Sequence, residues 1–198
     1  MPNIFDTALT KSPLFGAVKD GGVFDDIDNV HGSGTNGINT VDPIHKITVF
    51  HGVVIDGLQI TYDRIAGTQT SSPTTVSHGT QTKANDANLK EDTITLAANQ
   101  FIIAISGSQG DDPALGGRRI FQLSFVIYNS TTGHLEIKGP YGSTETGKPF
   151  YVTANGKFVA FGGYAVNTDN SVAKSSTEGL FGLYFYDVAS QPTGTATF

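Results

Sequence analysis

Regular alternation of apolar and polar residues constrains this chain more than any other feature. The clearest case is Phe121–Ile127, where every second residue is large and apolar. A period of two places such residues on one face of a β-strand. The same period recurs at Leu58–Tyr62, Leu135–Ile137 and Phe181–Phe185, and sustained helical periodicity does not occur. The sequence therefore predicts an all-β protein.

Shorter apolar runs, separated by turn signals, predict the other strands. Gly accounts for 24 of the 198 residues, above the roughly 7% usual in globular proteins, and excess Gly favours turns. Turn signals occur at Asp56-Gly57, at Asn155-Gly156 and in Gly139–Gly142. Asn155-Gly156 predicts a β-hairpin, because both residues tolerate positive φ. The short predicted strands are Ile47–Phe50, Val53–Ile55, Ile94–Leu96, Phe101–Ser106, Phe150–Thr153 and Phe158–Phe161.

Three polar stretches interrupt the strands, roughly at Asp28–Pro43, Gln69–Asp92 and Asn167–Gly179. They are rich in Gly, Ser, Thr and Asn, and strands continue on both sides, so they predict long loops within one domain, 1–198. The core is expected to span about 13–188, followed by a loose tail at Ser190–Phe198.

Charge and composition argue against several partners. The net charge of −6 does not favour nucleic acid. The longest strongly apolar run, roughly Phe101–Ile105, is far short of the ~20 residues that span a bilayer. The N-terminus lacks the pattern of a secretory signal, which favours a cytoplasmic protein without excluding non-classical secretion. With no Cys, neither disulfides nor thiolate metal sites are expected.

Motifs for catalysis or cofactors fail on inspection. The segment Gly142–Lys148 resembles the opening of a P-loop, but Pro149 stands where a Ser or Thr should hold magnesium, and a predicted strand follows in place of a helix. The five His lack zinc-site spacing. Asp25 and Asp26 lack the calcium-loop pattern and are expected to cap strand-edge amides. The chain is expected to be no enzyme and to need no metal or cofactor.

A set of segments in fixed order carries a resemblance to a known family. A Gly-rich loop precedes an aromatic-Asp-Asp in Gly21–Asp26, and a characteristic strand pair covers Ile47–Asp63. In these features and their order the chain resembles the jacalin-related lectins, over roughly Pro13 to Val188. The other similar segments are His78-Gly79, Phe101–Gly107, Ile120–Phe125, Gly139–Gly142, Gly147–Phe150, Gly156–Gly163 and Leu180–Tyr186.

This resemblance implies both a fold and a function. The family fold is a β-prism of three four-stranded Greek-key antiparallel sheets, consistent with many short strands joined by Gly turns. The family binds mannose/glucose-type or galactose-type glycans, without a metal, through loops at one end of the prism. The resemblance thus implies a lectin, and agglutination by several weak sites favours a homo-oligomer. In the family, galactose preference usually goes with a cleaved chain that has a new N-terminal Gly. The Gly loop is internal in this chain, so the resemblance favours mannose or glucose over galactose.

The position of the sugar site is less direct. The family combines a Gly of the N-terminal loop with Gly-x-x-x-Asp before the last strand, since Gly backbone amides and a carboxylate bind adjacent hydroxyls. Aligned on Leu180, this chain has Thr177 and Phe181 at the two motif positions, and 180 − 163 = 17 positions separate Gly163 from Leu180. The long segment could rebuild the pocket. The residues expected to bind sugar are then Gly21, Gly22, Gly163, Tyr164, Asn167 and Asp169.

Two alternatives stay open. Sugar could bind instead at a pseudo-equivalent loop containing His78, Gly79 and Asp86. Alternatively the site is lost, and the chain is a protein-interaction module on a lectin scaffold, since a fold does not guarantee a function.

Overall fold

A computed structural model describes residues 9–30, 36–66, 69–81, 89–114, 116–143, 147–166 and 179–189. Strands dominate, with one short helix, α1 (Asp26–Val30). The strands are β1 (Leu9–Lys11), β2 (Phe15–Gly16), β3 (Val23–Asp25), β4 (Asn36–Ile38), β5 (Ile44–His51), β6 (Ile55–Ala66), β7 (Gln69–Gly79), β8 (Lys90–Thr95), β9 (Gln100–Asp111), β10 (Arg118–Asn129), β11 (Leu135–Gly142), β12 (Lys148–Thr153), β13 (Gly156–Val166) and β14 (Gly179–Ala189).

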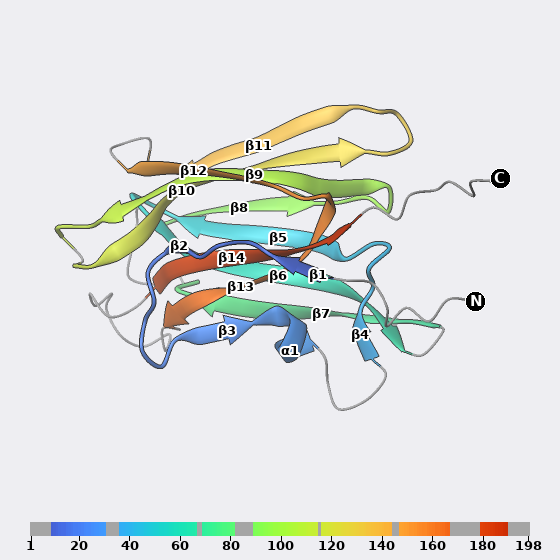
Figure 1. Cartoon of the computed structure of the whole chain (residues 1–198), viewed down its shortest axis with the longest axis horizontal. Helices are drawn as coiled ribbons and strands as arrows, with labels where there is room; N and C mark the ends of the chain where they lie inside the picture. The colour runs from blue at the N-terminus through green and yellow to red at the C-terminus, as the bar shows by residue number, and fades with distance from the viewer. Residues whose placement is uncertain are drawn as a thin grey trace, which may run out of the picture.

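The strands form three antiparallel sheets that enclose a common interior (Figure 1). Sheet I combines the N-terminal strands with the two C-terminal strands. Its order is β3-β13-β14, and β1 and β2 both pair with the other edge of β14. Sheet II has the order β7-β6-β5-β8, with β4 beside the end of β6 on the same edge as β5. Sheet III has the order β12-β9-β10-β11.

Each sheet therefore has four strand positions. In sheet I, β1 and β2 share one position, and in sheet II, β4 and β5 share one. In sheets II and III, three consecutive strands pair in sequence and the fourth returns beside the first, which is a Greek key. The predicted β-prism of three four-stranded antiparallel sheets is confirmed, with the Greek-key order traced in sheets II and III.

The core contains the side chains that the period of two placed on one face. Phe125, Leu123 and Ile127 of β10 are almost fully buried, and so are Leu58 and Ile60 of β6. Phe161 and Phe185 meet edge to face with ring centroids 5.1 Å apart. Such rings bury large apolar areas and dominate the stability of a small core.

Several local predictions are wrong. The predicted strand Val53–Ile55 begins as a bend, and the predicted loop Asp28–Pro43 contains the end of α1 and the strand β4. Asn155-Gly156 does not close a hairpin, because β12 pairs with β9 in sheet III and β13 pairs with β14 in sheet I; the turn carries the chain between sheets. Asp56-Gly57 lies within β6, and the bend precedes it at Gly52–Val54. The predicted loop from Gln69 is a strand as far as Gly79, where hydroxyl pairs such as Thr61–Thr75 link the strands in place of apolar contacts.

The prism has two distinct ends, which lie at the left and right of Figure 1. At the glycine end, defined by Gly21, Gly22, Gly52, Gly79 and Gly179, β13 ends and β6 and β14 begin. The opposite end, here the distal end, contains the start of β5 and the last residues of β6. Along β6 the two ends are about 26 Å apart, from eight residues between Ile55 and Asp63.

Candidate functional site

The N-terminal glycine loop lies against the end of β13. The Ala165 N–H donates to the Gly22 carbonyl at 2.7 Å, and a Cβ on Gly22 would lie 2.8 Å from the Ala165 carbonyl oxygen. Only Gly permits this approach without a shift of the backbone. Gly21 has φ +72° and open space where a Cβ would be, so its backbone faces outward at the tip of the turn.

Gly163 and Tyr164 lie in the adjoining sheet. Gly163 pairs with Leu183 on one side and Phe24 on the other, and a Cβ there would lie 2.0 Å from the Gly182 carbonyl oxygen. Close strand packing thus explains this glycine. Tyr164 pairs with Val23 and is half-buried. The structure therefore brings Gly21, Gly22, Gly163 and Tyr164 together, while Asn167 and Asp169 lie outside the described residues.

Phe181, at the position of the family's Asp, is the extra residue of a β-bulge. Tyr164 pairs with Gly182 and Ala165 with Leu180, which leaves Phe181 without a register partner. Its ring is buried, with the Arg119 guanidinium carbon 3.8 Å from its centroid. Phe181 is thus buried near the start of β14 and offers no group to a sugar. Thr177, the other motif position, lies outside the described residues.

Arg119 is a buried cation that sequence reasoning missed. Its side chain lies under the glycine end, near Gly179 and beside the buried acids Asp112 and Asp56. Burial lowers the pKa of the Arg119 guanidinium, and the two carboxylates act in the opposite direction. The only sequence signal for this buried cation is its position directly before the apolar alternation of β10. An exposed Arg at the start of a strand gives the same pattern, so the sequence could not distinguish the two.

A second buried polar group joins sheets I and II. His78 Nε2 donates to Asp26 Oδ1 at 2.8 Å, and its ring stacks on Phe24 with centroids 3.7 Å apart. The Tyr62 hydroxyl donates to Asp26 Oδ2 at 2.6 Å and accepts the Phe161 N–H at 3.1 Å. Burial and the neighbouring Asp26 raise the pKa of Tyr62 well above its usual value. The His78 imidazole therefore points into the interior.

The loop that follows His78 lies at the same end as the N-terminal glycine loop. Gly79 has φ +78°, and a Cβ there would lie 2.4 Å from the Asp56 carbonyl oxygen and 3.2 Å from the Gly179 carbonyl carbon. The Thr80 N–H donates to the Asp56 carbonyl. Gly79 thus lies beside Gly179, the first residue of β14, at the same end of the prism as Gly21 and Gly22, and Asp86 lies outside the described residues.

Asp25 fixes the strand that follows the glycine loop. It accepts the Ile27 N–H at 3.1 Å, so it caps an amide, but this amide belongs to the first turn of α1 and not to a strand edge as predicted. It also accepts the hydroxyls of Tyr184 at 3.0 Å and Tyr186 at 2.6 Å. Burial, followed by these bonds to Asp25, raises the pKa of both tyrosines. Asp26 does not cap an amide but holds the His78–Tyr62 group.

Sheet III repeats the arrangement of loops at the glycine end. The β9–β10 connection lies beside the segment before β12, and a cavity of about 400 Å³ lies between Gln109, Gly110, Arg118, Gly147 and Lys148. The residues after Gly147 form a strand, as predicted, and not the helix that a P-loop requires.

Within the described residues, no group of three or more His, Asp or Glu could hold a metal ion. Over the same ranges, no helix combines the length and apolar character needed to cross a bilayer.

Comparison with known proteins identifies the family. The sequence model of the jacalin-like lectin domain matches residues 12–172. The chain belongs to the jacalin-like lectin family. Its members are carbohydrate-binding proteins and not enzymes, so this domain is a carbohydrate-binding module of the lectin class. A comparison with curated protein sequences gives no match.

Solved jacalin-related lectins share the fold. A mannose-specific lectin from Morus nigra, solved with mannose, is 25% identical with a TM-score of 0.61, covering 96% of this chain and 99% of the other. A mannose-binding lectin from Ananas comosus is 24% identical with a TM-score of 0.61, covering 91% and 97%. A mannose-binding lectin from champedak is 22% identical with a TM-score of 0.61, covering 91% and 96%.

Proposed function

We propose that this lectin binds mannose- or glucose-type glycans at the glycine end, between the Gly21-Gly22 turn and the segment after β13. The observation that carries the proposal is the contact of Gly22 with Ala165, with Gly21 open beside it. This contact fixes a backbone turn near Tyr164, and the predicted binding residues Asn167 and Asp169 follow Tyr164 closely in the sequence. Preorganised amides beside an acid and an aromatic side chain suit a neutral sugar.

Specificity for mannose or glucose has separate support. The similar lectins from Morus nigra and Ananas comosus are described as mannose-specific and mannose-binding. Calorimetric titration with methyl α-mannoside, methyl α-glucoside and methyl α-galactoside tests the order, with galactose expected to be weakest. No saturable binding of any glycan on an array would reject the proposal.

Substitutions test which loop binds. Asn167→Ala and Asp169→Ala should each weaken methyl α-mannoside binding about tenfold, because each removes a group that would bond a sugar hydroxyl. Asp111→Ala removes an exposed acid of sheet III and is the matched control. If only Asp86→Ala weakens binding, the sugar occupies the loop after His78 and Gly79 instead.

One observation favours a second function. Phe181 is buried at the position of the family's acid, which supports a protein-interaction module with a degenerate sugar site. Capture of a protein partner that resists competition by free mannose and galactose would favour this alternative.

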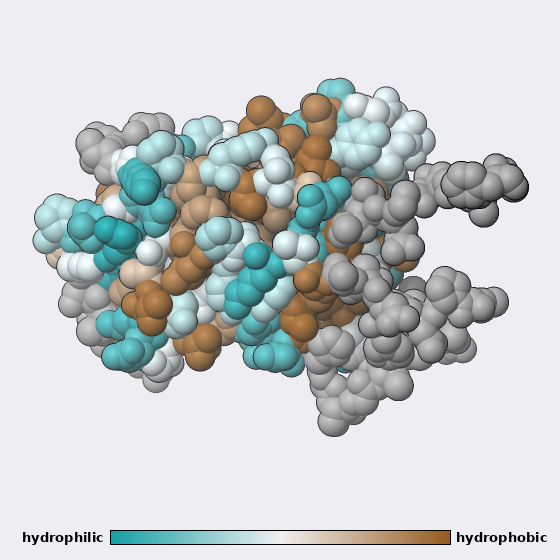
Figure 2. Space-filling view, in the orientation of Figure 1, coloured by the Kyte–Doolittle hydropathy of each residue, from teal (hydrophilic) through white to brown (hydrophobic). Residues whose placement is uncertain are grey.

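We also propose that the lectin is a homo-oligomer through the edge strand β11. Leu135 is 56% and Ile137 68% exposed, and Figure 2 shows brown apolar surface along the upper border of the molecule, over β11. Among the described strands, β11 pairs with β10 alone, so its other edge is open. An exposed strand edge with apolar side chains is a template for pairing with another chain.

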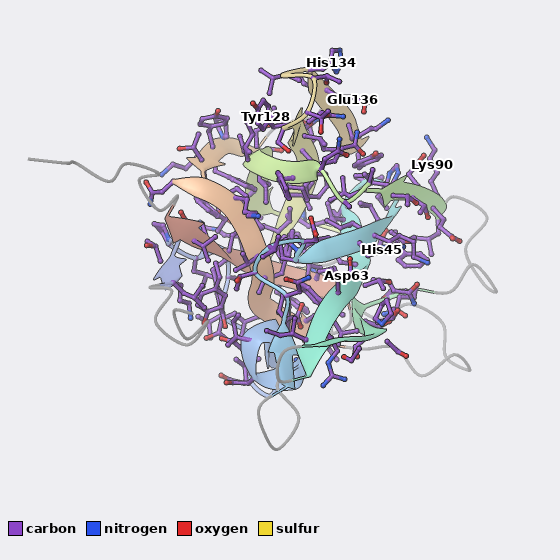
Figure 3. The ribbon with its side chains drawn as sticks, turned by 90° about the vertical axis from the view of Figure 1, so that its right-hand side faces the viewer. His45, Asp63, Lys90, Tyr128, His134 and Glu136 are labelled. Carbon is purple, nitrogen blue, oxygen red and sulfur yellow. The ribbon has the colours of Figure 1, made fainter. Side chains whose placement is uncertain are left out.

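The charge pattern of β11 selects a second copy as the partner. Glu136 and Lys138 lie on either side of Ile137, and Glu136 is labelled in Figure 3. An antiparallel pairing of two β11 strands about Ile137 places Glu136 of each copy opposite Lys138 of the other. Opposite charges at facing positions stabilise a strand pair, and a two-fold interface uses the same patch twice.

A further inference from the structure

A polar cavity of about 370 Å³ lies at the distal end, away from the glycine loops. It opens between the start of β5, the last residues of β6 and the segment after β8. His45 and Asp63 form part of its wall and lie close together in Figure 3, which views the molecule from this end. Its volume is within the range of small-molecule sites.

Opposite charges line this cavity. Asp42 and Asp63 contribute carboxylates, and His45 and Arg64 contribute basic groups. His45 Nδ1 is 3.7 Å from Asp63 Oδ2, which is too long for a strong hydrogen bond. The carboxylate and the imidazole thus retain capacity for another partner.

Two hydrogen-bond donors of the wall have no partner. Arg64 donates through Nη1 to Thr74 Oγ1 at 3.1 Å, but its Nε is buried without a hydrogen bond. Ser71 Oγ is likewise buried without one. Both atoms are covered by neighbouring atoms, so a ligand in the cavity reaches them only after the Arg64 or Ser71 side chain turns. A buried donor that makes no bond destabilises a fold by about 1–3 kcal/mol, and a ligand that supplies an acceptor after such a turn would offset this cost.

The cavity also has an apolar part. Ile44 and Leu96 are buried in its wall, and Ala97 and Ala98 are exposed at its rim. These methyl and methylene groups offer a surface to weakly apolar C–H groups. A ligand of this cavity therefore combines hydrogen-bonding groups with C–H faces.

The charges narrow the class of ligand. An anion would approach Asp42 and Asp63, and a cation would approach Arg64, so either meets a like charge. A hydroxyl group both donates and accepts, and can therefore bond the partly exposed Asp63 carboxylate and His45 imidazole of the wall. We propose that the distal cavity binds one neutral sugar residue of a glycan, independently of the glycine end. This proposal goes beyond the proposed function and does not rest on it.

Amide chemical shifts of the full-length, ¹⁵N-labelled protein test the proposal. The probes are methyl α-mannoside and methyl α-glucoside, with glucuronate and glucosamine as charged counterparts. We expect a neutral glycoside to cause saturable shifts of the Ser71, Ala97, Ala98 and Gln100 amides, and the charged sugars to bind more weakly. Absence of saturable shifts there with both neutral glycosides would overturn the proposal, as would stronger binding of a charged sugar.

Variants separate the two ends. Ser71→Ala and Asp63→Asn should each weaken the distal binding up to about tenfold and leave any shifts of Gly21 and Gly22 unchanged. Asp111→Asn, an exposed acid outside the cavity, is the control. Shifts confined to Gly21 and Gly22 would overturn this inference and support the proposed function; shifts confined to the distal amides would do the reverse. A thermal melt of each variant verifies folding.

Discussion

The glycine end and the distal end are built from the same strands but present different groups. At the glycine end, the polar side chains of His78 and Arg119 are buried beneath loops whose glycines press backbone against backbone, and the buried Asp26 accepts a hydrogen bond from His78. At the distal end, Asp63 and His45 remain partly exposed around a cavity. The buried polar cluster of Asp26, His78 and Tyr62 holds the strand that leads into a loop of the glycine end, whereas the distal end offers side chains directly.

Removing the buried acid Asp26 tests this polar cluster and has the largest expected effect on stability. Asp26→Ala leaves His78 and Tyr62 without their shared acceptor, and should lower the free energy of unfolding by about 3–5 kcal/mol, measured by denaturant titration. Asp28→Ala, an exposed acid on the same helix, should change it by less than about 0.5 kcal/mol. Equal effects of the two variants would show that the bonds of Asp26 to His78 and Tyr62 do not stabilise the fold.

A methyl group on the loop distinguishes close packing from backbone strain. Gly22→Ala places a Cβ 2.8 Å from the Ala165 carbonyl oxygen. It should destabilise the protein by about 1–3 kcal/mol and weaken methyl α-mannoside binding. Gly116→Ala, with φ +70° and open space around the new Cβ, is the control: it adds strain of about 1–2 kcal/mol without changing sugar affinity. Loss of affinity in both variants would argue against a specific role for Gly22.

The sequence predicted the core strands better than the edge strand β7, the connection between sheets and the buried polar cluster. Alternation in β10 and β6 fixed the strands and core, because a period of two has one structural meaning. It could not predict that Gln69–Gly79 is a strand, since hydroxyl pairs replace apolar contacts there. Nor could local turn chemistry at Asn155-Gly156 report that consecutive strands enter different sheets. The buried partners of Asp26 are 36 and 52 residues away in sequence.

Alkaline pH should loosen the strands around Asp25 and Asp26. The pKa values of Tyr184, Tyr186 and Tyr62 are raised in the folded protein. Unfolded tyrosines release their protons near pH 10 while these retain theirs, so the stability present below about pH 10 declines as the pH rises towards the folded pKa values. Denaturant titrations across this range measure the decline.

The Tyr186→Phe variant supplies the comparison for this pH dependence. It removes one of the ionisable groups bonded to Asp25, so its stability should fall less steeply above pH 10 than that of the unmodified protein. Tyr151→Phe, an exposed tyrosine of β12, should leave the slope unchanged. A slope that Tyr186→Phe does not reduce would contradict the role assigned to the Asp25 cluster.

Pairing through β11 would change how the two ends are displayed, with the smallest effect on the fold itself. A two-fold antiparallel pairing reverses the direction of one prism, so each side of the dimer presents one glycine end and one distal end. Glu136→Lys places like charges opposite each other and should convert dimer to monomer in analytical ultracentrifugation, with less than about 0.5 kcal/mol change in stability. Adding Lys138→Glu restores opposite charges and should restore the dimer. A double variant that stays monomeric, or a single variant that stays dimeric, would place the interface elsewhere and leave the two ends to act in separate directions.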